Sequence, residues 1–351
     1  MDAILKNEER AILTLRQLYR SYGYCPYKMS RFEEYDLYVR SKDFLVSDQI
    51  ITFSGDRGKL MALKPDVTMS IVKNAPEEPG VVQKVYYNEN VYRDYREIMQ
   101  AGLECVGDLG SYEIAEVALL AAKSLALLGE DFVLDLSHMG LIAAVLDSCS
   151  LEGEQRKLAL EYLRRKNLHS LEQLCGENSQ KLLALAACHG NGQVLKELLT
   201  TEEERQAWLE LEELLILLDE AGFGRHVRLD FSVGNNMRYY SGVVFRGYLA
   251  GIHTSVLSGG QYDRLPRKLG RKARAVGFAI YVDLLQELQK GEDSLWVDTL
   301  ILHDGTVDAK TLSAAAEKAA AEGTVLVTQK LPGDRRWKRL LRYEKGEAVT
   351  C

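Results

Sequence analysis

The chain has 351 residues, of which 46% are hydrophobic and 27% charged, so it is long enough for two or three domains and a substantial core. Its 44 basic and 51 acidic residues leave a formal net charge of −7, so charge does not predict tight binding to a nucleic-acid backbone, and a basic patch is left only as a local alternative at Arg264 to Arg274. The six cysteines form no CxxC pair, which argues against a zinc site or a disulfide framework. No run reaches about 18 apolar residues and no signal peptide is evident, so we expect a cytoplasmic protein without a membrane span, metal or cofactor.

The first part of the chain mixes helical and extended patterns. Residues 3–21 have apolar side chains at spacings of three and four, which predicts an amphipathic helix. Two alternating runs at 49–63 flank Gly55-Asp56-Arg57-Gly58, which predicts a hairpin. Directly afterwards, Asp66 and Thr68 precede a helical stretch, and either residue could cap that helix at the rim of a sheet. Capping alone is the commoner role for an Asp at such a position.

Residues 81–106 are predicted to form two strands joined by a short turn. In the second strand, the two-residue period places Gln100 and Glu104 on one face, on either side of Gly102. Their Cα atoms would be roughly 13 Å apart, so two inclined side chains could enclose a molecule of the size of an amino acid. The alternative is a solvated outer face, the usual environment of Gln and Glu.

The middle of the chain is predominantly helical. A helix is predicted at 111–128, then a strand at 132–136 and a second helix at 138–149. From 150 to 222 the sequence is rich in Leu and Glu with few β-branched residues, which predicts an all-helical insert between two halves of a sheet domain. The sheet is expected to resume at Val227.

Residues 228–248 are predicted to form a second hairpin, because alternating runs flank Gly234-Asn235-Asn236, residues that readily adopt positive φ. In the return strand, Tyr240 shares a face with Gly242, which leaves an open surface beside the ring for a small planar group. The alternative is an ordinary aromatic pair in a sheet.

The last part of the chain contains a Gly-Gly pair at 259–260, then a glycine-containing strand that runs into a helix at 275–288. From about Trp296, a strand, an alanine-rich helix, a second strand and a basic tail predict one βαβ-like unit, too small for a large core. A core in two halves is predicted at 1–149 and 223–292. A helical insert is predicted at 150–222 and a small C-terminal α/β unit at 293–351.

Four motifs, in this order, resemble the catalytic core of class II aminoacyl-tRNA synthetases, specifically that of the histidyl enzyme, over residues 5–290. LKPDVT is similar to the LRPE-x-T element of that family, and VYRDYREIMQAGLECVG to its motif 2 strand pair. MRYYSGVVF resembles its LDYY-x-x-x-VFE signature, and SGGQYDRL with AVGFAIYVDLL resembles its GGGRYD element and motif 3. The resemblance implies an α+β fold in which an antiparallel six-stranded sheet is flanked by helices.

The resemblance also implies a histidine pocket. Asp66 and Thr68 would lie near the amino group of the ligand, with Gln100 beside them. Glu104 and two tyrosines would surround the imidazole, and a carboxylate suits an imidazole N–H because a charge-assisted hydrogen bond discriminates against apolar isosteres. The complete implied histidine-binding set is Asp66, Thr68, Arg93, Gln100, Glu104, Tyr240 and Tyr262.

Three departures from the synthetase pattern concern ATP. The motif 2 loop is shortened to residues 92–96, the histidyl-specific arginine falls on Asn235, and the motif 3 arginine falls on Leu284. Adenylate formation needs positive charge on the phosphates, because negative charge shifts to the leaving pyrophosphate. A core that keeps the amino-acid pocket but loses these cations resembles the regulatory subunits of ATP phosphoribosyltransferase.

This second resemblance implies a non-catalytic protein that accompanies a short-form catalytic subunit in the first step of histidine biosynthesis. Such a subunit is needed for activity of its partner and mediates feedback inhibition by L-histidine. The family implies a hetero-octamer containing homodimers, formed through about residues 24–51, and the truncated C-terminal unit implies no tRNA role. Two alternatives are a histidyl-tRNA synthetase or related amino-acid-activating enzyme, and an amino-acid sensor for an unrelated partner.

Overall fold

The computed structural model describes residues 5–40, 45, 49–76, 78–188, 192–233, 239–289, 297–331, 336–344 and 347–349. The chain divides into two compact units, Met1–Leu288 and Gln289–Cys351. The finer division of the first unit into two half-cores and an insert stays a prediction. Among the described helices, none combines the length and the apolar character that crossing a membrane requires.

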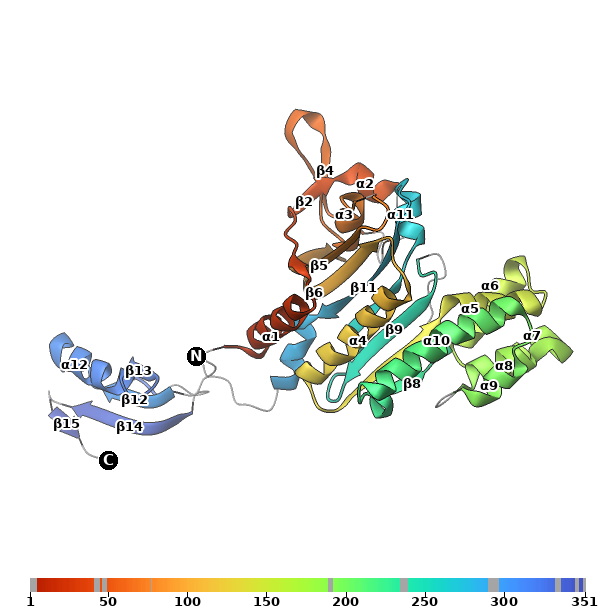
Figure 1. Cartoon of the computed structure of the whole chain (residues 1–351). Coiled ribbons are helices and arrows are strands. Elements are labelled where there is room, and N and C mark those ends of the chain that lie inside the picture. The colour runs from red at the N-terminus through yellow and green to blue at the C-terminus, as the bar shows by residue number, and fades with distance from the viewer. Residues whose placement is uncertain are drawn as a thin grey trace. The chain divides into compact units, whose positions relative to one another are not determined.

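The first unit is built on an eight-stranded sheet with the order β1-β5-β6-β11-β10-β9-β7-β8 (Figure 1). The six strands from β5 to β7 in this order pair antiparallel, and β1 and β8 add one parallel strand at each edge. The six-stranded antiparallel sheet implied by the synthetase resemblance is therefore confirmed. The strands are β1 (Cys25–Pro26), β5 (Val82–Arg93), β6 (Arg96–Gly107), β7 (Phe132–His138), β8 (Val227–Leu229), β9 (Val243–Leu249), β10 (Leu257–Gln261) and β11 (Arg274–Tyr281).

Helices pack on the face of this sheet that carries Leu103 and Cys105. Helix α4 (Ser111–Leu128) packs against β9, β10 and β11, and α1 (Asn7–Ser21) packs against β5, β6 and α4. Their apolar sides and the sheet residues beneath them form the main hydrophobic core. The opposite face, which carries Gln100 and Glu104, is therefore left for the polar site described below.

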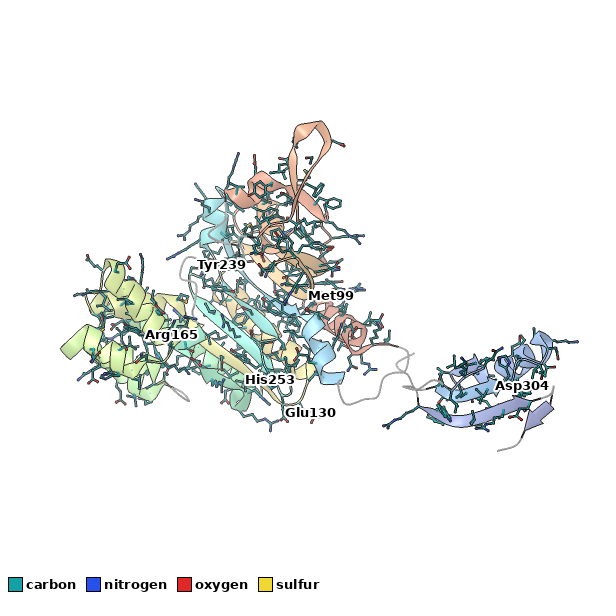
Figure 2. The ribbon with its side chains drawn as sticks, turned by 180° about the vertical axis from the view of Figure 1, so that it is seen from behind. Met99, Glu130, Arg165, Tyr239, His253 and Asp304 are labelled. Atoms are coloured by element: carbon teal, nitrogen blue, oxygen red, sulfur yellow. The ribbon has the colours of Figure 1, made fainter. Side chains whose placement is uncertain are left out.

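The predicted helices at 138–149 and 150–222 are present. The last of them packs against α4, α5 and β7, so it extends the layer that covers the sheet. Figure 2 shows the side chains of the unit from behind, with Arg165 in this helical segment and Tyr239 beside the sheet. The helices are α5 (Met139–Ser148), α6 (Gly153–Arg164), α7 (Leu168–Cys175), α8 (Gln180–Ala186), α9 (Gln193–Leu198) and α10 (Glu202–Glu220).

A smaller three-stranded antiparallel sheet has the order β2-β4-β3. The hairpin predicted at 49–63 is confirmed, because β3 and β4 pair antiparallel across a short 3-10 turn. Helix α3 packs against β6 and α11, which brings the segment of Asp66 and Thr68 over the large sheet. The elements are β2 (Phe32–Glu34), α2 (Tyr35–Val39), β3 (Thr52–Ser54), β4 (Leu60–Leu63), α3 (Thr68–Lys73) and α11 (Arg264–Lys268).

The hairpin predicted at 228–248 is wrong. Strand β8 pairs in parallel with β7, and β7 lies between β8 and β9 in the sheet. The chain after β8 turns into a 3-10 segment, η5 (Phe231–Val233), which packs against α6 and α8. Alternating apolar residues specify which face of a strand is buried but not which strand is its neighbour. The prediction therefore paired the strand that begins at residue 228 with the wrong strand. The predicted turn at 234–236 lies outside the described residues.

The second unit is a four-stranded sheet with the order β13-β12-β14-β15. Strands β12 and β13 are parallel and joined through α12, as the βαβ pattern predicts. The tail predicted as merely basic instead continues the sheet, because Leu340 and Leu341 are half-buried between its charged residues. The elements are β12 (Val297–His303), α12 (Ala309–Ala320), β13 (Val325–Thr328), β14 (Trp337–Glu344) and β15 (Glu347–Val349).

Candidate functional site

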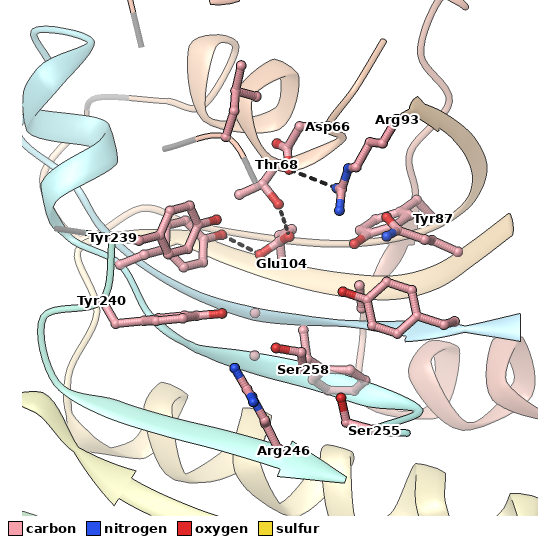
Figure 3. Close-up of a pocket in the computed structure, with 18 residues that line it drawn as sticks. Asp66, Thr68, Tyr87, Arg93, Glu104, Tyr239, Tyr240, Arg246, Ser255 and Ser258 are labelled. Atoms are coloured by element: carbon pink, nitrogen blue, oxygen red, sulfur yellow. Dashed lines mark hydrogen bonds and ion pairs between the residues drawn. The ribbon is translucent and has the colours of Figure 1, made fainter. Parts of the chain in front are cut away.

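A cavity of about 410 Å³ lies on the polar face of the large sheet (Figure 3). Its lining comes from β5, β6, β10 and β11 and from the segments around α3 and β9. The structure brings every residue of the expected site into this lining, namely Asp66, Thr68, Arg93, Gln100, Glu104, Tyr240 and Tyr262. Their role in binding histidine stays a prediction.

Glu104 lies at the centre of one wall. It is only 2% exposed, and Gln100 on the same strand is buried as well, so the alternative of a solvated outer face is wrong. Across the sheet, Gly277 on β11 is paired with Glu104, and a Cβ atom there would be 1.7 Å from the Glu104 Oε2 atom. Position 277 must therefore lack a side chain for Glu104 to adopt this position.

Two hydroxyl groups donate to the Glu104 carboxylate. The Thr68 hydroxyl donates to Oε1 at 2.7 Å, and the Tyr262 hydroxyl donates to Oε2. Burial raises the pKa of Glu104 to about 8, while the hydrogen bonds from Tyr262 and Thr68 oppose this rise. The group therefore changes protonation state close to neutral pH, which suits an interaction with an imidazole.

Asp66 accepts a backbone hydrogen bond in the first turn of a helix and also lines the cavity, while its contact with a ligand stays a prediction. Its Oδ1 accepts from the Met69 backbone N–H at 2.9 Å, in the first turn of α3. Its Oδ2 lies 3.5 Å from Nη2 of Arg93, whose Nε donates to the Pro65 carbonyl at 2.5 Å. Burial raises the pKa of Asp66, and the charge of Arg93 opposes this rise.

Aromatic side chains close one end of the cavity. The ring centroids of Tyr239 and Tyr240 are 4.7 Å apart, and those of Tyr239 and Tyr262 are 5.5 Å apart. Tyr239 and Tyr240 both line the cavity although they are adjacent in the sequence, because both precede the start of β9 at Val243 and the alternation of a strand does not apply to them.

Further lining residues were not predicted from the sequence. Tyr87 could have been found from strand pairing, because it is opposite Gly102 and its hydroxyl lies 2.6 Å from where a Gly102 Cβ would be. The others come from strands and loops that meet only in the folded chain. The lining residues that sequence reasoning missed include Tyr87, Tyr239, Arg246, Ser255, Ser258 and Tyr281.

Two of the three departures from the synthetase pattern lie in the described part of the chain. Leu284 lies in the 3-10 segment η6 (Val282–Gln289) and packs against the main core. The connection between β5 and β6 is reduced to Asp94 and Tyr95, with φ values of 49° and 60°, as in a two-residue turn with both φ angles positive. Asn235 lies outside the described residues.

Comparisons with known proteins agree with this fold. ATP phosphoribosyltransferase regulatory subunits are among the relatives: that of Bacillus cereus (strain AH187) is 26% identical over 314 residues, 83% of this chain and 75% of the relative. The regulatory subunit of Caldanaerobacter subterraneus subsp. tengcongensis is 29% identical over 304 residues, which cover 80% of this chain and 79% of the relative.

Solved structures with the same fold include both kinds of protein. A protein described as an ATP phosphoribosyltransferase regulatory subunit/histidyl-tRNA synthetase from Bacillus halodurans has a TM-score of 0.74 at 24% identity, covering 96% of this chain and 94% of that chain. A chain of the ATP phosphoribosyl transferase (HisG:HisZ) complex from Thermotoga maritima has a TM-score of 0.62 at 17% identity, with coverages of 78% and 97%. Histidyl-tRNA synthetase from Nostoc sp. PCC 7120 has a TM-score of 0.70 at 18% identity, with coverages of 93% and 83%.

These matches confirm the resemblance that the four motifs predict. The family model described as histidyl-tRNA synthetase matches residues 3–285, which is most of the chain. The chain therefore belongs to the histidyl-tRNA synthetase family.

Proposed function

We propose that this chain is a regulatory subunit of ATP phosphoribosyltransferase and that the cavity around Glu104 binds L-histidine. The most direct support is the buried Glu104 carboxyl group, which faces a cavity large enough for an amino acid. Relatives named as such regulatory subunits, 26% to 29% identical over most of the chain, support the same function.

The chemistry of the cavity suits histidine. A Glu104 carboxylate accepts an imidazole N–H, and the Tyr240 ring offers a surface against which the imidazole packs. Asp66 and Gln100 supply acceptors for the ammonium group at the same wall. An apolar side chain of similar shape would leave the buried Glu104 carboxylate without its ligand donor, so the site would reject it.

The same structure argues against catalysis by the chain itself. Activation of an amino acid by ATP requires cations on the phosphates in the transition state. Leu284 packs into the core at one expected cation position, and the short turn at Asp94 and Tyr95 leaves no motif 2 loop to reach a triphosphate. We therefore assign the chain a non-catalytic role.

The proposed partner is the short-form catalytic subunit, in a hetero-octamer that contains homodimers of this chain. The segment expected at the homodimer interface, about residues 24–51, presents Phe32 at 46% exposed, in contact with Phe53 at 39% exposed. An exposed aromatic pair of this kind favours an interface between copies. A tRNA role is not proposed, and the place of action is the cytoplasm.

The deciding experiment combines two assays on the purified full chain. We expect the phosphoribosyltransferase activity of a short catalytic subunit to depend on this chain and to be inhibited by histidine when both are present. Histidine-dependent exchange of pyrophosphate into ATP should stay at the level of a protein-free control. Strong exchange, without any effect on the phosphoribosyltransferase, would show that the function is wrong.

A histidyl-tRNA synthetase is the second candidate, because the family model carries that name and a synthetase shares the fold. It requires an ATP site built in some other way. The exchange assay separates the two functions, and a catalytic subunit that co-purifies with the chain would also exclude a sensor for an unrelated partner.

A further inference from the structure

Arg246 lies on the wall of the cavity opposite Glu104. In the sheet it belongs to one cross-strand row with Ser258 on β10, Ala279 on β11 and Gly102 on β6. Three strand spacings of about 4.8 Å place the Arg246 and Gly102 Cα atoms roughly 14 Å apart. Because Ala279 and Gly102 are small, this row forms a floor over which a ligand can extend from the Glu104 wall to Arg246.

The direction of the side chain agrees with the row. Figure 3 shows the Arg246 guanidinium pointing toward the cavity, below Tyr240 and near Ser258, while Thr68 and Asp66 lie on the other side with Glu104. The charge of Arg246 also reaches Tyr240, since it opposes the rise to about 12 that burial causes in the Tyr240 pKa.

The charges of the described lining are therefore separated. Asp66, Glu104 and Arg93 share one wall, where Arg93 is 3.5 Å from Asp66 and donates to a backbone carbonyl. Arg246 supplies a cation on the opposite wall. A ligand with an imidazole at one end and an α-carboxylate at the other matches this arrangement.

We infer that Arg246 binds the α-carboxylate of a free amino acid whose basic side chain faces Glu104. The inference rests on the proposed function and adds the group that distinguishes a free amino acid from an amine. A guanidinium binds a carboxylate through two parallel N–H donors, which fixes orientation as well as charge. This chain has arginine where the synthetase signature LDYY-x-x-x-VFE has glutamate, so the cation is a departure from that signature.

A phosphate group is the competing ligand, because a guanidinium binds phosphate with similar geometry. The described lining argues against a polyphosphate, because it contains two carboxyl groups, those of Asp66 and Glu104, as well as its two arginines, Arg93 and Arg246. A single carboxylate needs one cation, which Arg246 provides.

Titration calorimetry of the full chain, alone and with the catalytic subunit, tests the inference. The ligands are histidine and histidinol, in which a CH₂OH group replaces the carboxylate. Wild type should bind histidine roughly 10- to 100-fold more tightly than histidinol, the loss expected for one charge-assisted contact. Arg246→Met should bring this ratio to about one, mainly by weakening histidine, and Arg246→Lys should recover part of it.

The matched control is Arg267→Met, which removes an exposed arginine on α11 and should leave the ratio unchanged. Circular dichroism and thermal unfolding establish that each variant is folded. A ratio that survives in folded Arg246→Met, or that is lost in Arg93→Met instead, overturns the inference while the histidine pocket stands. Pyrophosphate binding that depends on Arg246, with equal histidine affinity in both proteins, assigns the arginine to phosphate. If wild type binds neither histidine nor histidinol, the proposed pocket fails together with the inference.

Discussion

Glu104 on β6 and Gly277 on β11 are paired across the large sheet, and the Glu104 carboxylate fills the space that a side chain at position 277 would need. The pair shows how the cavity wall is built: a buried acid is held by two hydroxyl donors on one side and by the absence of a side chain on the other. Each of these features can be changed separately.

Gly277→Ala should weaken histidine binding without removing any polar group. The new Cβ would lie 1.7 Å from Oε2, so the carboxylate must leave its position and its donors. We expect a loss of affinity of roughly 10- to 100-fold and a loss of stability of about 1 to 3 kcal/mol, as for an overpacked site. Calorimetry and urea unfolding measure the two effects.

The control for this variant is Gly129→Ala, at the end of α4, where a Cβ would be 3.3 Å from the flexible tip of Leu249. It should leave histidine affinity unchanged. Unaltered affinity in Gly277→Ala as well would mean that the observed position of Glu104 is not the one that binds ligand.

Glu104→Ala should weaken histidine binding by roughly 10- to 100-fold, because the imidazole N–H would be buried without an acceptor, at about 1 to 3 kcal/mol. Binding of the catalytic subunit should persist. The control is Glu220→Ala, which removes an exposed glutamate at the end of α10. Equal histidine affinity in wild type and Glu104→Ala would instead indicate a scaffold inherited from a synthetase that no longer contacts a ligand.

The stability of the unliganded protein should depend on pH through Glu104. Its pKa is about 8 in the folded chain and 4.5 is the ordinary value, so between these values the folded state holds a proton that the unfolded state has lost. Unfolding free energy therefore falls as pH rises from about 4.5 to 8, with no further change from this group above that range. Glu104→Gln, which cannot ionise, should lose this part of the pH dependence.

Thermal unfolding of wild type and Glu104→Gln at pH 5, 6.5, 8 and 9 measures this difference. The stability of the variant relative to wild type should increase up to about pH 8 and then level off. Parallel curves for the two proteins would show that Glu104 titrates normally in the folded chain.

The homodimer should be weakened by a charge in the exposed aromatic pair. Phe32 and Phe53 have ring centroids 5.3 Å apart and lie on the small β2-β4-β3 sheet. Phe32→Glu should shift the protein from dimer to monomer in sedimentation experiments at micromolar concentration, because an interface does not readily bury an unpaired carboxylate. Leu168→Glu, at an exposed apolar residue of α7, is the control. A wild type that is monomeric at this concentration would contradict the predicted assembly.

The sequence by itself determined the elements whose pattern is local and strong. The helix at 111–128 has the same bounds in the structure, because eighteen residues with continuous helical periodicity need no information about their neighbours. The pairing of β5 with β6 was predictable from the short turn, and the period of two placed Gln100 and Glu104 on one face. The motifs then identified seven of the residues that line the cavity in advance.

Only the tertiary structure decided what surrounds that face and which strands are neighbours. A two-residue period indicates which side chains share a face. It does not indicate whether that face is solvated or buried, which had to be settled for Gln100 and Glu104, or which strand pairs with β8. Tyr87 and Arg246 enter the cavity from strands far apart in the sequence, through the cross-strand rows of β5, β6, β11, β10 and β9. Such rows are set by long-range hydrogen bonding between strands, which no local pattern of side chains encodes.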